Sequence, residues 1–255
     1  MQLLTTDSPA ISFTMNKQSD ETYFLQGPHS RKSELMFLFR VLFEFIKGFR
    51  AFHFLGPCVT VFGSARYREG HPYYDLGRQL GRRFAAMGFT VMTGGGPGIM
   101  EAVNRGAREA NGKSVGCNIV LPYEQRPNSY LDKWVNIRYF FVRKVLLSKY
   151  SYSFVVLPGG YGTLDEFFEA LTLIQTDTMK HFPVVLFGKE FHQALYDHLK
   201  RLVKAGTIGI KDIDLFLLTD NVDEAIAHID KYAVQEFGLK KVKKIRPLAW
   251  LGEGE

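Results

Sequence analysis

The sequence predicts an α/β protein in which one parallel, Rossmann-like sheet is covered by helices on both faces. Short apolar runs typical of buried strands alternate with helical patterns along most of the chain, which favours a parallel sheet. Two of the predicted strands run into glycine-rich loops, at 94–98 and 159–162, and a helical pattern follows each loop. An apolar helical segment precedes this region, so we expect an extra N-terminal helix in addition to the sheet.

Length and composition indicate one large domain. The chain has 255 residues, of which 46% are apolar and 23% charged, as in an ordinary globular protein with its own core. The formal net charge is +6, and a C-terminal cluster supplies five positive charges: Lys240, Lys241, Lys243, Lys244 and Arg246. The rest of the protein is therefore nearly neutral, and we expect a solvated basic tail at 239–255 rather than a nucleic-acid surface.

Two segments precede the predicted domain. Residues 1–30 are polar and irregular, without the basic-then-apolar order of a secretion signal, so we expect a loose N-terminal arm. Residues 31–55 are rich in Phe and Leu, but Arg40, Glu44 and Lys47 interrupt the run at helical spacing. These charges exclude a membrane span and predict a helix with one polar stripe. Packing on the main domain and contact with a second subunit both remain open for this helix.

The main domain is predicted at 56–238. Apolar, β-branched runs predict strands at 58–62, 89–93, 114–120, 134–139, 154–157, 183–187 and 215–218. Helical patterns predict helices at 73–87, 99–110, 141–150, from the glycine loop through 171, from about 188 to 204, and at 222–237. Residues 121–133 contain two prolines and are expected to form a loop.

The two cysteines point to a reducing compartment. Cys58 and Cys117 both lie in apolar, strand-like runs, which is typical of buried thiols rather than of a disulfide framework or a metal site. We therefore expect a cytoplasmic protein. Because no His, Cys or Asp residues show ligand spacing, we expect no metal.

The glycine loop at 159–162 predicts an anion site. Glycines at 159, 160 and 162 allow the backbone to bend sharply and to approach a ligand closely. The helix that follows would direct free N–H groups and its positive dipole end toward a phosphate. Both glycine loops follow strands, and ligands bind at this edge of open parallel sheets. Neither loop completes a Walker A or a dinucleotide motif, so simple tight turns remain an alternative.

Charged residues near the loops have two interpretations each. Thr163 and Glu166 fit a capping box, but the Glu166 carboxylate would also suit sugar hydroxyls or a cation developing at the sugar. Glu101 follows the other loop and could either stabilise a helix N-terminus or contact a ligand. Arg143 and Lys144 could be a surface pair, or a guanidinium could hold a phosphate or act on a leaving base.

These motifs resemble the LONELY GUY (LOG) family. The sequence PGGYGTLDE at 158–166 matches the family signature PGGxGTxxE. Residues 141–144 resemble the arginine–lysine element, and residues 62–65 and 94–101 resemble the first two loops. The resemblance covers residues 57 to 200 approximately. LOG proteins are phosphoribohydrolases that act on cytokinin riboside 5′-monophosphates, and many were mislabelled lysine decarboxylases.

The resemblance implies cleavage of the N-glycosidic bond of AMP or an N6-modified AMP, without a cofactor, to give a free base and ribose 5-phosphate. Arg143 and Glu166 match the catalytic pair of the family. We expect the following residues to bind the substrate and its phosphate: Ser64, Gly95, Gly96, Glu101, Lys144, Gly159, Gly160, Gly162 and Thr163. LOG-like proteins are typically dimers or larger, which implies at least a homodimer, with a nucleoside monophosphate as substrate.

Two other functions fit the sequence less well. Lysine decarboxylation would need pyridoxal phosphate on a lysine with an acidic partner for the ring nitrogen, and nothing marks such a lysine beyond the proximity of Lys144. The second alternative is a protein of the same fold that binds a nucleotide, or carries a molybdenum cofactor, without hydrolysing it. The presence of both Arg143 and Glu166 favours the hydrolase.

Overall fold

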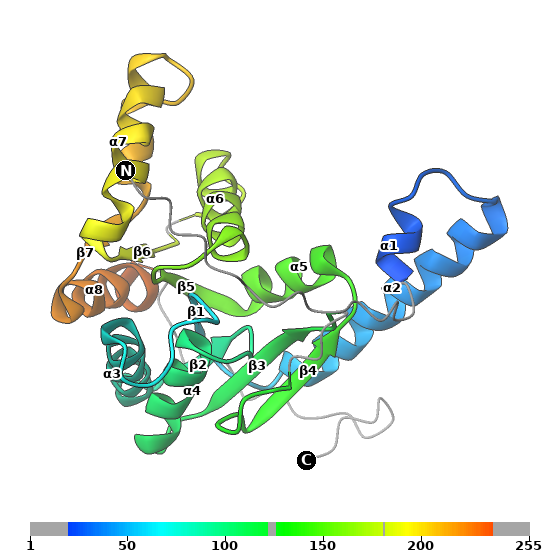
Figure 1. The fold of residues 1–255 in the computed structure, drawn as a ribbon, viewed down its shortest axis with the longest axis horizontal. Coiled ribbons are helices and arrows are strands. Elements are labelled where there is room, and N and C mark those ends of the chain that lie inside the picture. The colour runs from blue at the N-terminus through cyan, green and yellow to red at the C-terminus, as the bar shows by residue number, and fades with distance from the viewer. Residues whose placement is uncertain (1–19, 122–125, 181, 237–255) are drawn as a thin grey trace, which may run out of the picture.

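One parallel seven-stranded sheet forms the centre of the computed structural model, which describes residues 20–121, 126–180 and 182–236 (Figure 1). The strand order is β4-β3-β2-β1-β5-β6-β7, and every neighbouring pair is parallel. The strands are β1 Cys58–Phe62, β2 Thr90–Thr93, β3 Ser114–Ile119, β4 Lys133–Ile137, β5 Ser151–Val156, β6 Val184–Phe187 and β7 Leu217–Thr219. The predicted α/β fold is thereby confirmed.

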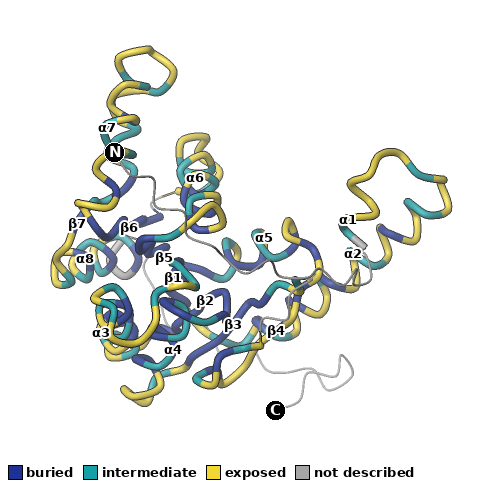
Figure 2. The backbone as a smooth tube through the Cα atoms, in the orientation of Figure 1, coloured by how far each residue is buried: buried dark blue, intermediate teal, exposed yellow. Residues whose placement is uncertain are grey.

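Helices cover both faces of the sheet. The helices are α1 Asp20–Phe24, α2 Arg31–Phe52, α3 Pro72–Ala86, α4 Ile99–Glu109, α5 Phe140–Tyr150, α6 Tyr161–Gln175, α7 Lys189–Lys204 and α8 Val222–Ile229. One apolar core lies between the sheet and α3, α4 and α8, and the other lies between the sheet and α2, α5, α6 and α7. Because both faces are covered, every residue of β1 is buried, and the strands form the buried centre in Figure 2.

The structure differs from the predicted elements near the C-terminus. The strand expected at 215–218 is preceded by a 3-10 helix, Ile210–Leu215, and begins only at Leu217. The Asp212 carboxylate accepts a hydrogen bond from the Gly209 amide and stabilises this turn. The helix expected at 222–237 ends as an α-helix at Ile229 and continues as a π-helical segment, Asp230–Glu236. The predicted basic tail lies outside the described residues.

Helix α2 turns two of its charged residues, Glu44 and Lys47, toward the domain and leaves apolar residues exposed. The Glu44 carboxylate accepts a hydrogen bond from the Arg138 amide, and the Lys47 ammonium group donates to the Asn136 carbonyl. Phe37 and Phe52 pack into the core. The exposed apolar residues of α2 are Leu35, Met36, Leu38, Phe39, Leu42, Phe43, Ile46 and Phe49. No helix among the described residues is long and apolar enough to cross a membrane.

The arm predicted at 1–30 contains a helix that the sequence did not indicate. Helix α1 lies beside α2, and the Phe24 ring stacks on the Phe37 ring with 3.8 Å between their centroids. The second part of the arm is therefore attached to the protein rather than loose. Residues 1–19 lie outside the described residues.

Candidate active site

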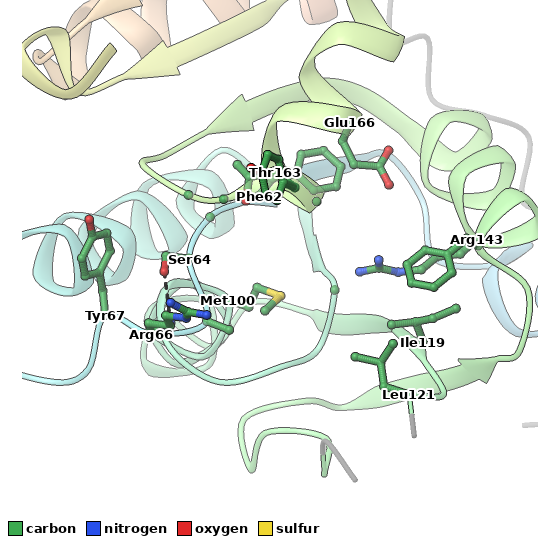
Figure 3. A pocket seen from close by; sticks show the side chains of 18 of the residues that line it. Phe62, Ser64, Arg66, Tyr67, Met100, Ile119, Leu121, Arg143, Thr163 and Glu166 are labelled. Atoms are coloured by element: carbon green, nitrogen blue, oxygen red, sulfur yellow. Dashed lines mark hydrogen bonds between the residues drawn. The ribbon is translucent and has the colours of Figure 1, made fainter. Parts of the chain in front are cut away.

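A cavity of about 610 Å³ opens at the carboxyl ends of β1 and β5 (Figure 3). The strand order reverses between these two strands, and such switch points are where open α/β sheets bind ligands. The loops at 63–67 and 159–163 line the cavity together with Phe62, Gly94, Met100, Ile119, Leu121, Phe140, Arg143, Glu166 and Phe191. The cavity brings together seven of the predicted site residues: Arg143, Glu166, Ser64, Gly159, Gly160, Gly162 and Thr163.

Backbone hydrogen bonds hold the loops of this cavity against one another. The Ser64 amide donates to the Pro158 carbonyl over 3.0 Å, which joins the loop after β1 to the loop after β5. The Ser64 carbonyl accepts from the Ile99 amide over 3.0 Å, which adds the first residue of α4. The loop positions are therefore fixed by main-chain contacts that do not depend on side-chain identity.

The loop at 159–163 presents the N-terminus of α6 to the cavity. Gly160 is the N-cap residue, and no side chain in the described part of the chain caps the helix there. A side chain at position 159 would displace Thr163, because a β-carbon there would lie 2.2 Å from Thr163 Oγ1. The close approach brings the Thr163 side chain against the loop backbone. An uncapped helix N-terminus in a cavity is suited to an anion.

Glu166 is a buried carboxylate one turn into α6. Only 4% of the residue is exposed, and its Oε2 atom has no hydrogen-bond partner among the described residues. The capping-box interpretation is wrong, because Gly160 is the N-cap residue and Thr163 lies within the helix. Burial raises the pKa of Glu166 to about 7, against the opposing effect of the positive charge on Arg143. Glu166 is thus a carboxylate that exchanges a proton near neutral pH.

Arg143 projects into the same cavity from the first turn of α5. Its Nε atom donates a hydrogen bond of 2.9 Å to the Cys117 carbonyl at β3, which fixes the guanidinium. Gly94 lies against that group, since a β-carbon there would be 2.4 Å from Arg143 Nη2. Figure 3 shows Arg143 and Glu166 pointing into the cavity from neighbouring helices. A fixed cation and a carboxylate with a raised pKa therefore share one space.

Four predicted site residues lie outside the cavity lining: Gly95, Gly96, Glu101 and Lys144. Gly95 and Gly96 turn their carbonyls inward, where the buried amide of Asn128 donates to both over 3.2 and 3.1 Å. The second glycine loop thus contributes Gly94 to the cavity, while its next two residues are bound to the segment before β4.

Glu101 and Lys144 are engaged by neighbouring side chains. The Tyr74 hydroxyl donates to Glu101 over 3.0 Å. Lys144 forms ion pairs of 3.0 Å with Asp165 and 2.9 Å with Glu169, which join α5 to α6. Lys144 still acts on the site at a distance, because its positive charge lowers the pKa of Glu166.

The cavity also has walls that sequence reasoning missed. Met100, Ile119 and Leu121 supply apolar surface, and Arg66 lies across the cavity from Arg143 (Figure 3). Phe140, which precedes Arg143 on α5, also lines the cavity. The position of Ile119 at the end of β3 is the signal that could have found it, because side chains at the carboxyl ends of neighbouring parallel strands meet. The arrangement combines an apolar wall, a carboxylate and an anion site, as a small-molecule site does.

Both cysteines are buried, and the Cys117 thiol is close enough to Arg143 and Glu166 for their charges to affect its pKa. Cys58 and Cys117 are free and buried, and burial raises the pKa of each thiol to about 12, so both are unreactive near neutral pH. Within the described ranges, no group of three or more His, Cys, Asp and Glu side chains could hold a metal ion.

Comparisons with known proteins agree on one family. Residues 100–229 match the family model described as "Possible lysine decarboxylase". The cytokinin riboside 5′-monophosphate phosphoribohydrolase of Mycobacterium tuberculosis is 31% identical over 155 residues, 60% of this chain and 82% of the relative. The cytokinin riboside 5′-monophosphate phosphoribohydrolase LOG of Oryza sativa subsp. japonica is 27% identical over 199 residues, which are 75% of this chain and 80% of the relative.

Solved structures share the fold. The X-ray structure of TM1055 superposes with a TM-score of 0.53 at 28% identity, over 69% of this chain and 99% of that chain. The molybdenum cofactor binding protein from Rippkaea orientalis gives a TM-score of 0.51 at 22% identity, over 69% of this chain and 96% of that chain. At that identity, the second similarity concerns the fold alone.

Proposed function

The chain belongs to the LOG family, whose model is described as possible lysine decarboxylase, and from this membership and the site geometry we propose that it is a phosphoribohydrolase. The proposed reaction is hydrolysis of the N-glycosidic bond of a nucleoside 5′-monophosphate, AMP or an N6-modified AMP, to a free base and ribose 5-phosphate. The observation that carries the proposal is Glu166, a buried carboxylate without a hydrogen-bond partner among the described residues, in the cavity formed by the uncapped N-terminus of α6.

The proposed phosphate site is the loop at 159–163. The N-terminal amides of α6, the Thr163 hydroxyl and the helix dipole would together hold the 5′-phosphate. The Ser64 hydroxyl lies in the adjoining loop, at the same cavity. Binding the phosphate here would place the ribose one turn away, beside Glu166, and the base toward the apolar wall that includes Ile119 and Leu121.

The proposed bond cleavage leaves positive charge on the sugar. As the C1′–N bond breaks, its electron pair goes to the base, and an oxocarbenium-like centre develops at C1′. The ionised form of Glu166 would stabilise that charge and orient the water whose oxygen bonds to C1′. The proton lost by the water would pass to the carboxylate, the departing base would take a proton from solvent, and Glu166 would then release its proton to solvent and become ionised again. The Arg143 guanidinium would hold the phosphate or steady the departing base.

Two alternatives have weaker support. Burial opposes the charged form of Lys144, but hydrogen bonds with Glu169 and Asp165 outweigh it and raise the pKa of this amine, so Lys144 is a poor candidate for a pyridoxal linkage. A non-hydrolytic nucleotide or molybdenum-cofactor carrier has no need of a carboxylate such as Glu166 held without a hydrogen bond, which costs stability. Glu166 therefore favours hydrolysis over carriage.

We further propose that the protein works as a homodimer or larger homo-oligomer in the cytoplasm. Helix α2 exposes a row of apolar side chains, and α5 adds Phe140, Phe141 and Val145, which are 40–48% exposed. Large apolar surfaces are rare on monomers, and symmetric dimers are the commonest way to bury them. The buried free thiols Cys58 and Cys117 suit a reducing compartment.

A panel assay tests this function. The protein is incubated with the 5′-monophosphates of adenosine, N6-isopentenyladenosine, guanosine and cytidine, and free base and ribose 5-phosphate are measured by chromatography. The expected result is equimolar release of both products from one or both adenine nucleotides. Binding without release of base from any nucleotide would support the carrier instead.

A further inference from the structure

Helix α1 contacts the turn of α5 that carries Arg143. The Glu21 carboxylate accepts a hydrogen bond from the Phe140 amide, with both of its oxygens 3.2 Å from the nitrogen. Phe140 is the first residue of α5, and the N-cap residue Tyr139 supplies no side-chain cap to this helix in the described part of the chain. A residue 119 positions earlier thus provides the cap.

Several contacts hold α1 in this position. Phe24 stacks on Phe37 with an interplanar angle of 3°. The Tyr23 ring stacks on His29 at 4.0 Å, and the Tyr23 carbonyl forms a hydrogen bond of 2.7 Å with His29 Nε2. The Glu21 contact is therefore part of a folded segment that packs on the start of α2.

The capped turn holds two residues of the cavity. Phe140 forms part of the apolar wall, and Arg143 supplies the guanidinium. The Arg143 amide donates to the Tyr139 carbonyl over 3.1 Å, which closes the same first turn of α5 whose Phe140 amide Glu21 binds. A helix N-cap and an acidic group at a helix N-terminus each stabilise the first turn.

We propose that Glu21 is a positioning residue for the active site. It holds the first turn of α5 in the conformation in which Arg143 Nε reaches the Cys117 carbonyl. The catalytic consequence rests on the proposed phosphoribohydrolase function, whereas the structural coupling between Glu21 and Arg143 does not. The N-terminal arm is thus a distant part of the active-site framework.

Two variants and a matched control test the coupling. Glu21→Ala removes the acceptor, and Glu21→Gln keeps one acceptor oxygen but removes the charge. Glu34→Gln removes a charge from the same segment, where the carboxylate bonds the His29 amide instead of α5. NMR of the ligand-free protein measures solvent exchange of the Arg143 Nε–H proton. We expect exchange to be about fivefold faster in Glu21→Ala, because the free energy of a lost N-cap corresponds to about a fivefold change in the opening equilibrium of the turn. The change should be smaller in Glu21→Gln and absent in Glu34→Gln.

Kinetics with the nucleotide substrate tests the catalytic consequence. We expect kcat to fall about fivefold in Glu21→Ala, with partial retention in Glu21→Gln and no change in Glu34→Gln. Unchanged Arg143 exchange in Glu21→Ala would overturn the coupling, and unchanged kcat with altered exchange would overturn the catalytic consequence. If wild-type protein releases no base, the proposed function fails, and the exchange measurement still decides the coupling. Should Glu21→Ala not fold, the near-isosteric Glu21→Gln decides by the same comparisons.

Discussion

The guanidinium of Arg143 lies so close to Gly94 that a β-carbon at position 94 would be 2.4 Å from Nη2. The same β-carbon would be 2.8 Å from the sulfur of Met100. Arg143 is held on its other side by the Cys117 carbonyl, so it has little room to adjust. The first glycine of the loop after β2 therefore determines where the proposed catalytic cation can lie.

Gly94→Ala should displace the guanidinium and lower kcat/KM at least ~10-fold, because small misplacements of a catalytic group are costly. Steady-state kinetics measures the effect, and circular dichroism checks the fold. Gly209→Ala is the matched control, because φ at Gly209 is −76° and the nearest atom to an added β-carbon lies 3.4 Å away. Equal activity of Gly94→Ala and Gly209→Ala would contradict the positioning of Arg143 by Gly94.

Glu166→Gln should abolish turnover and raise thermal stability at pH 8. The folded-state pKa of Glu166 is about 7, above its usual value of 4.5, so the folded protein loses stability as the pH rises through this window. Removing the carboxylate removes that loss, which amounts at most to roughly 3 kcal/mol. Differential scanning calorimetry at pH 5 and pH 8 measures it. A variant that is active, or that is several degrees less stable at pH 8, would indicate a structural role for Glu166.

The pH dependence of kcat/KM should show an acid limb governed by Glu166. Because the proposed mechanism uses the ionised carboxylate, activity should rise as the pH passes through about 7. Lys144→Gln should move this limb to higher pH, since the positive charge of Lys144 lowers the pKa of Glu166. Carboxyl ¹³C NMR of Glu166 reports the pKa directly. If the acid limb lies at the same pH in Lys144→Gln as in wild-type protein, the group that titrates in this limb is not Glu166.

Light scattering at micromolar concentration should give a particle of at least two 29.1 kDa chains. Phe43→Glu should shift it toward the monomer, because Phe43 is 66% exposed on the outward face of α2. Tyr161→Glu is the control for the light-scattering measurement, because Tyr161 is 95% exposed and lies outside α2. It is not a control for activity, because Tyr161 lines the cavity. A wild-type particle of one chain would refute the homodimer.

Mixing the inactive chains Arg143→Ala and Glu166→Gln should restore no activity, because Arg143 and Glu166 of one chain line the same cavity. Arg143 lies on α5, whose neighbouring side chains Phe141 and Val145 are exposed and available to a partner. If activity returns on mixing, the site is built from both chains. If none returns under conditions of proven subunit exchange, each site lies within one subunit.

The sequence predicted the core of the candidate site because parallel strands bring their carboxyl ends together. The segments carrying Ser64, Gly159 and Glu166 follow β1 and β5, which are neighbours in the sheet, so placing the strands places the loops. Arg143 also reaches the cavity, although its contact with the Cys117 carbonyl depends on packing that no local pattern reveals.

Two of the remaining differences come from long-range hydrogen bonds, and the third from where a helix begins. Gly95 and Gly96 turn inward because Asn128 bonds their carbonyls from more than 30 positions away. Helix α1 is too short to show periodicity, and its attachment through Glu21 depends on the position of α5. The Thr163–Glu166 spacing fits a capping box, but the helix begins earlier, after Gly160.

The proposed phosphoribohydrolase activity is tested most directly by comparing AMP with adenosine in H₂¹⁸O, using wild-type protein and Glu166→Gln. Wild-type protein should release adenine and ribose 5-phosphate in equal amounts from AMP, with ¹⁸O at C1 of the sugar. Adenosine should react far more slowly, because each helix N-terminus contact contributes on the order of 1 kcal/mol to holding the phosphate. Glu166→Gln should release no adenine. Comparable rates on AMP and adenosine, or no adenine from AMP or N6-modified AMP, would contradict the account.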